Sequence, residues 1–168
     1  AGLIGNTNNK SIDANFPDHL SFEWGDTQRI NRWERLMQAR ELHTRDSFIE
    51  AQLDTVSFTA RSLLPLVGGD LWFTGDAAPE GTLERRRQEA LALLADWNGE
   101  MNEHLPEPLI YAAWMRELQS RLIRDELGPL AEEFIHPDPV FIERVYRDTD
   151  GASVWCDVEQ SAPVETCT

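Results

Sequence analysis

The sequence Gly5-Asn6-Thr7-Asn8-Asn9 follows a short apolar run, Gly2-Leu3-Ile4, near the start of the chain. Three asparagines in four positions make a poor helix and a poor strand, because Asn side chains bond to nearby backbone and tolerate left-handed backbone angles. The run therefore predicts a strand end that breaks into a structured loop. A carboxamide is also a neutral donor of two N–H bonds, which suits it to stabilising an oxyanion. On local chemistry alone, a surface turn that satisfies its own backbone is the favoured interpretation.

Outward from this run, the chain divides into three predicted regions. Pro17 and Gly25 interrupt residues 1–26, which we expect to be extended and loop-like. Residues 27–148 carry apolar side chains at three- and four-residue steps, the spacing of amphipathic helices, and are predicted to form a helical domain. Residues 149–168 lose this pattern and are predicted to be an irregular C-terminal tail. The predicted fold class is therefore mainly α with an extended N-terminal stretch.

Helix start and stop residues place the expected helices within the central region. The predicted helices run from a cap at Asp26 or Thr27 to Arg40, from Thr44 to Pro65, from Thr82 to Trp97, from Leu109 to Leu127, and as two shorter helices within residues 130–148. Asp54 falls beside the apolar face of the second helix, and we expect it to pair with an arginine such as Arg29 or Arg61.

The composition excludes several classes of partner. Thirty acidic residues against fifteen basic ones give a formal charge of −15, which argues against nucleic acid and anionic membranes. No apolar run approaches the length of a membrane-spanning helix. Cys156 and Cys167 are separated by ten residues, so a disulfide and two unpaired thiols are both compatible with the sequence.

Five segments, in order along residues 2–127, share a pattern with a known family. They are Gly5-Asn6-Thr7-Asn8-Asn9; Phe22-Glu23-Trp24-Gly25 with Arg29-Ile30; Gln52-Leu53-Asp54 with Ser57 and Ala60; Leu93-Leu94-Ala95-Asp96-Trp97-Asn98-Gly99-Glu100-Met101; and Ile110-Tyr111 with Trp114 and Leu118. Together they resemble the later part of the catalytic subunit of the penicillin acylase (penicillin amidase) family. The resemblance implies that the chain is a helical segment of a larger αββα N-terminal nucleophile hydrolase.

The resemblance also implies roles for individual residues. In this family an N-terminal serine attacks an amide carbonyl, and an asparagine side chain helps to hold the oxyanion. Residues 1–26 would then be the oxyanion-loop segment, with Asn8 as the oxyanion-hole residue and Asn6 as the alternative. Arg29 matches a family arginine that orients groups near the site. Asp18 falls near a family aspartate that binds a structural calcium; no cofactor is otherwise required.

The chain departs from the family because it opens at Ala1 and not at a serine. We therefore expect a fragment of the large subunit that is inactive alone, with the remaining part of the catalytic subunit and the small subunit as its partners. The expected substrate is a small N-acyl amide, such as a β-lactam side chain or an acyl-homoserine lactone. A periplasmic or secreted location would follow. The alternative is a non-enzymatic acidic helical interaction module.

Overall fold

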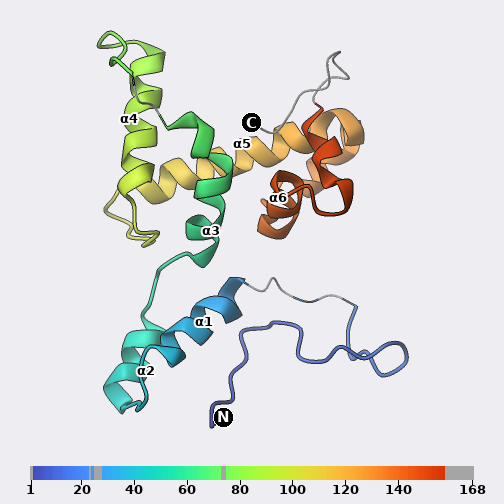
Figure 1. Cartoon of the computed structure of the whole chain (residues 1–168). Helices are drawn as coiled ribbons and strands as arrows, with labels where there is room; N and C mark the ends of the chain where they lie inside the picture. Colours follow the sequence, from blue (N-terminus) through green and yellow to red (C-terminus); the bar gives the residue numbers. More distant parts are fainter. Residues whose placement is uncertain (1, 23, 25–27, 73–74, 158–168) are drawn as a thin grey trace. The chain divides into compact units, whose positions relative to one another are not determined.

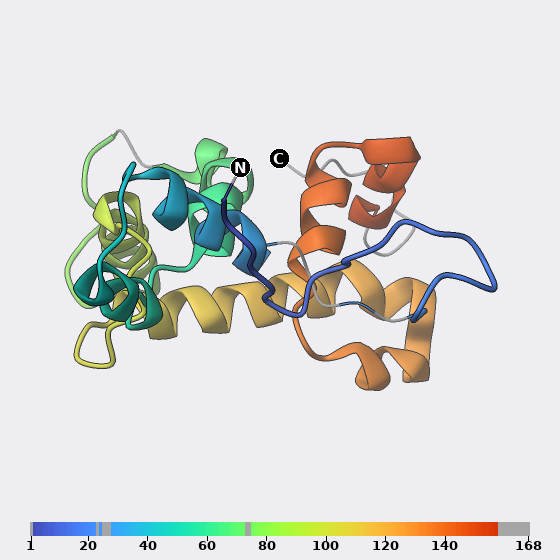
Figure 2. The ribbon, with the colours of Figure 1, turned by 90° about the horizontal axis from the view of Figure 1, so that it is seen from below.

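The computed structural model describes residues 2–22, 24, 28–72 and 75–157. The chain divides into two compact units, Ala1–Phe58 and Thr59–Thr168, and each is considered by itself. Within the described residues the elements are helices and loops, and no β-strand forms (Figures 1 and 2). The predicted mainly α fold with an extended N-terminal stretch is confirmed. None of the described helices combines the length and the apolar character needed to cross a bilayer.

The first unit contains a non-helical stretch, residues 2–22, followed by helices α1 (Gln28–Gln38) and α2 (Arg45–Gln52). Thr44 begins α2 as predicted, through a capping box. Its hydroxyl accepts from the Ser47 backbone N–H at 3.2 Å, and the Ser47 hydroxyl accepts from the Thr44 N–H at 2.9 Å. The predicted caps of α1, Asp26 and Thr27, lie outside the described residues.

The single helix predicted from Thr44 to Pro65 is wrong in two respects. The structure forms α2 and a separate helix α3 (Phe58–Val67), with residues 53–57 between them. The intervening Asp54-Thr55-Val56-Ser57 consists of short polar and β-branched side chains, which favour non-helical backbone. Pro65 does not stop the helix but lies inside α3. Because Pro65 is exposed, the carbonyl that loses its N–H partner lies on the water-facing side.

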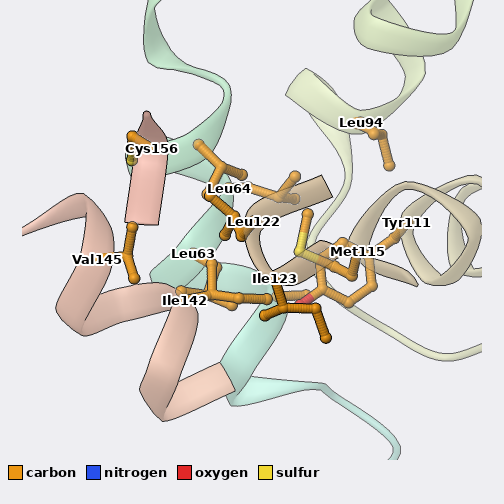
Figure 3. Packing of buried hydrophobic residues seen from close by; sticks show 12 residues of the cluster. Leu63, Leu64, Leu94, Tyr111, Met115, Leu122, Ile123, Ile142, Val145 and Cys156 are labelled. Atoms are coloured by element: carbon orange, nitrogen blue, oxygen red, sulfur yellow. The ribbon is translucent and has the colours of Figure 1, made fainter. Parts of the chain in front are cut away.

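The second unit is built around one apolar core, to which α3 contributes one face. Ile142 and Leu63 are 0% and 1% exposed, and their side chains gather with Ile123 from the facing helix (Figure 3). Burial raises the pKa of the Tyr111 hydroxyl far above its usual range. The buried cluster consists of Ala60, Leu63, Leu64, Val67, Leu94, Tyr111, Met115, Leu122, Ile123, Ile142, Val145 and Cys156.

Most helices of this unit begin and end where the sequence predicts. Thr82 caps α4 (Leu83–Asp96) by accepting from the Arg85 N–H at 3.1 Å. Helix α5 (Glu107–Leu127) ends at Gly128, whose φ of 52° is one that glycine adopts without strain. The short 3-10 helix η1 (Gly69–Leu71) lies between α3 and α4.

The C-terminal part is more ordered than predicted. After the 3-10 helix η2 (Gly128–Phe134), Asp138 caps α6 (Pro139–Tyr146) by accepting from two backbone N–H groups. Residues 149–156, predicted as irregular tail, form the 3-10 helix η3 (Thr149–Cys156). Trp155 in η3 packs edge-on against Phe141 of α6, with ring centroids 5.4 Å apart, which the loss of helical periodicity concealed. Cys156 is buried and disulfide-bonded; Cys167 lies outside the described residues.

Candidate functional site

The asparagine run forms a structured loop, as predicted, but residues 2–5 before it do not form the predicted strand. Two overlapping side-chain bonds hold the loop: Asn6 Oδ1 accepts from the Asn8 N–H at 2.8 Å, and Asn9 Oδ1 accepts from the Thr7 N–H at 3.1 Å. Asn8 has a φ of 65°, in the left-handed region that asparagine tolerates better than most residues. The loop therefore fixes the backbone from which the Asn8 side chain projects.

One face of α1 receives this loop. An added Cβ at Gly5 would lie only 2.3 Å from Cζ2 of Trp33, so the backbone approaches the indole more closely than any larger residue would allow. Arg29 lies one turn before Trp33 and therefore on the same face of α1. Gly5 meets Trp33 and Asn8 meets Arg29, so the N-terminal stretch runs beside the helix (Figure 1).

The Arg29 guanidinium contacts the Asn8 carboxamide. Arg29 Nη1 donates to Asn8 Oδ1 over 3.4 Å, a long hydrogen bond between two exposed side chains. Because the oxygen faces the cation, the Nδ2 amide group points away from it. A positive charge at the oxygen also draws electron density from the amide and makes its N–H groups better donors. The arrangement presents a polarised neutral donor, which is the chemistry that an oxyanion requires.

A second arginine of α1, Arg32, forms an ion pair with Asp54. Arg32 Nε donates to Asp54 Oδ2 at 2.8 Å, and Arg32 Nη2 also bonds to Asp54 Oδ1, so the pairing is bidentate. The hydrogen bond from Arg32 lowers the pKa of the Asp54 carboxyl, while burial opposes this shift. The predicted pairing of Asp54 with an arginine is confirmed, but the partner is Arg32 and not Arg29 or Arg61. The sequence signal that could have found Arg32 is its place one turn after Arg29 on α1.

Comparison with known proteins now identifies the family. The penicillin amidase family matches residues 1–168. The chain belongs to the penicillin amidase family. It is 28% identical over 133 residues to the acyl-homoserine lactone acylase QuiP of Pseudomonas aeruginosa, and 27% identical over 134 residues to the same-named acylase of Pseudomonas putida. These matches cover 76% and 77% of this chain but only 16% of each relative. No solved structure matches the chain significantly.

Within this penicillin amidase segment, the two candidate asparagines are held differently. The Asn6 carbonyl is engaged inside the loop, whereas the Asn8 side chain reaches across to α1. In both residues the side-chain oxygen accepts a hydrogen bond, so the choice of Asn8 over Asn6 as the donor stays a prediction. The orienting role of Arg29 likewise stays a prediction.

Asp18 lies away from this pair along the N-terminal stretch of the penicillin amidase segment. Its carboxylate is exposed, and its backbone N–H donates to the Asn15 carbonyl at 2.9 Å in a turn. Among the described residues, no group of three or more His, Cys, Asp and Glu side chains could hold a metal ion. The calcium role of Asp18 therefore stays a prediction.

Proposed function

We propose that this chain is part of an enzyme that hydrolyses the amide bond of an N-acyl substrate, and that Asn8 supplies an oxyanion-hole donor. The observation that carries the proposal is the hydrogen bond from Arg29 Nη1 to Asn8 Oδ1, which turns the Asn8 amide N–H groups outward. Membership of the penicillin amidase family supports amide hydrolysis as the reaction. It also favours this function over that of an acidic interaction module.

The chemistry assigns a limited role to these residues. A serine in the remaining part of the catalytic subunit attacks the acyl carbonyl, and the carbonyl oxygen gains a negative charge. The Asn8 Nδ2–H donates to that oxygen, together with a backbone N–H from elsewhere in the enzyme. Arg29 keeps the carboxamide in this orientation but does not touch the reacting atoms. Collapse of the intermediate expels the amine, and water then releases the acyl group from the serine.

The substrate class we favour is an acyl-homoserine lactone, because both relatives carry that name. A β-lactam with an acyl side chain is the second class, and it presents the same amide bond to the site. The disulfide at Cys156 supports an oxidising, periplasmic or secreted location for the enzyme.

We expect the remaining part of the catalytic subunit and the small subunit to be the partners of this chain. Exposed apolar side chains of the first unit support this expectation. Ile4, Phe16 and Phe22 are 103%, 77% and 83% exposed, which is unusual for large apolar residues gathered in one stretch. Contact with the rest of the enzyme would cover them.

The test is an Asn8→Ala substitution in the complete enzyme, assayed for hydrolysis of an N-acyl-homoserine lactone. Loss of one oxyanion donor lowers kcat by about a hundred- to a thousandfold. Asn8→Asp keeps the shape and removes the donor, so it should lose as much. Asn15→Ala, an exposed asparagine of the same stretch, is the matched control and should leave kcat unchanged. A normal kcat for Asn8→Ala would remove Asn8 from the mechanism.

A further inference from the structure

Three arginines of α1, spaced three residues apart, each bind a different part of the first unit. Arg29 binds Asn8 in the loop, Arg32 binds Asp54, and the Arg35 guanidinium lies 4.5 Å from the ring centre of Phe58. The helix therefore joins the asparagine loop on one side to residues 54–58 on the other.

From this arrangement we infer that Asp54 is a positioning residue for the oxyanion donor. Through Arg32 it fixes the rotation of α1 about its axis, and so holds Arg29 against the Asn8 carboxamide. The inference rests on the proposed function of Asn8, and it assigns to Asp54 a role beyond that proposal.

The Arg32–Asp54 pair has the geometry needed to fix a helix. Its two parallel N–H···O bonds restrict direction as well as distance, unlike a single contact. The Arg32 and Asp54 side chains are 24% and 15% exposed, so water screens the pair only partly. The other ion pair between separate segments of this unit, Arg40–Glu50, has side chains 50% and 62% exposed. Of these two ion pairs, only Arg32–Asp54 is both bidentate and partly buried.

The Arg29–Asn8 contact cannot hold itself in place. It is a single exposed hydrogen bond of 3.4 Å, already at the long end of the range. A helix surface lies about 5–6 Å from the axis, so turning α1 by about 10° would move a side-chain tip by about 1 Å. A shift of this size would break the contact, and a misplacement of about 1 Å can cost on the order of a hundredfold in rate.

Residues 54–58 supply the second fixed point. Phe58 stacks under Arg35, one turn beyond Arg32, so the same short segment holds α1 at two successive arginines. The break between α2 and α3 contains Asp54, and Phe58 is the first residue of α3. The loop between α2 and α3 thus carries the carboxylate that pairs with Arg32.

The experiment compares Asp54→Asn with Asn8→Ala in the complete enzyme, singly and together. Asp54→Asn keeps the size of the side chain and removes the charge that pairs with Arg32. We expect kcat to fall about tenfold or more with KM nearly unchanged, because an oxyanion donor acts in the transition state. In the double variant, Asp54→Asn should cost nothing beyond the loss from Asn8→Ala. Glu50→Gln, which removes the exposed pair, should leave kcat unchanged.

Each outcome decides the inference. A normal kcat for Asp54→Asn, with a large loss for Asn8→Ala, would overturn the positioning role and leave the proposed function standing. The inference would also be overturned if kcat of the double variant fell by the product of the two single-variant decreases, because Asp54 would then act independently of Asn8. If Asp54→Asn does not fold, Arg32→Lys replaces it, since lysine keeps the charge but not the bidentate geometry. A lower kcat for Arg32→Lys, with no further decrease when it is combined with Asn8→Ala, supports the inference. A normal kcat for Arg32→Lys overturns it.

Discussion

The Thr59–Thr168 unit buries a cluster of twelve residues, whereas the described part of Ala1–Phe58 buries one apolar side chain, Met37. The second unit is stabilised by removing apolar surface from water, a contribution that grows with every buried methylene. The first unit is stabilised by directional contacts: the contacts of the α1 arginines, the capping box of α2, and the packing of Gly5 against the Trp33 indole. The candidate site lies in the unit that lacks a large core. Its geometry therefore depends on a few specific contacts.

The largest expected effect is on the core of the second unit. Leu63 is 1% exposed at the centre of the cluster, so Leu63→Ala should lower the free energy of unfolding by about 2–5 kcal/mol. Urea unfolding of the 168-residue chain, followed by circular dichroism, measures this. Leu109→Ala is the matched control, because Leu109 is 74% exposed on α5, and it should change the free energy by less than about 0.5 kcal/mol. Equal effects of the two changes would contradict a single apolar core.

Gly5→Ala should separate activity from stability in the first unit. The new methyl group would meet the Trp33 ring and displace the loop that carries Asn8. A displacement of about 1 Å lowers the rate on the order of a hundredfold, while little buried surface is lost. The measurement is kcat of the complete enzyme beside urea unfolding of this chain. Gly2→Ala is the control, because nothing lies within 4 Å of its added Cβ, and it should keep full activity.

The helix ends were predictable because their causes are local. Thr44 and Thr82 cap helices through side chains that bond three residues away, and Gly128 ends α5 through its own backbone angle. Apolar side chains at three- and four-residue steps predicted the helical region for the same reason.

The contacts that build the site were harder to predict because they join distant residues. Arg32 and Asp54 are 22 positions apart, and no periodicity within either segment shows that α1 and the 53–57 loop place them together. The Gly5–Trp33 approach was missed for the same reason. Asn8 and Arg29 were singled out through family resemblance, and local chemistry alone favoured a surface turn. The structure adds the contact between them.

The two units should also respond to pH with opposite sign. In the second unit, burial, together with Asp125 and Asp157, raises the pKa of Glu126 to about 7, so protonation favours the folded state. This contribution is complete below the usual carboxyl pKa and is lost as the pH rises through about 7. The free energy of unfolding should therefore increase as the pH falls from 8 to about 5, measured by urea unfolding at each pH. Glu126→Gln should abolish the increase; its persistence would assign the effect to another group.

In the first unit, the lowered pKa of Asp54 gives the reverse dependence. The stabilisation from its pair with Arg32 is present above the unfolded carboxyl pKa and is lost as the pH falls through the lower folded value. Amide hydrogen exchange, resolved by peptide, should thus show α1 losing protection in acid before the core of the second unit does. Asp54→Asn should lower the protection of α1 already at neutral pH, because the stabilisation that acid removes is then absent at every pH. Simultaneous loss of protection in both units would contradict separate stabilisation.

The smallest expected effect comes from the second ion pair of the first unit. Arg40 and Glu50 are both at least half exposed, so solvent screens their attraction and the two long side chains lose freedom by pairing. Glu50→Gln should therefore change the free energy of unfolding by about 0.5 kcal/mol or less, in the same urea experiment. Asp54→Asn should cost more, because it leaves a partly buried guanidinium without its carboxylate. Both changes remove one negative charge from a chain with a net charge of −15, so the shift in overall repulsion cancels in the comparison. The difference between them then measures what burial and bidentate geometry add to an ion pair. If Glu50→Gln cost as much as Asp54→Asn, α1 would not be held chiefly at Arg32.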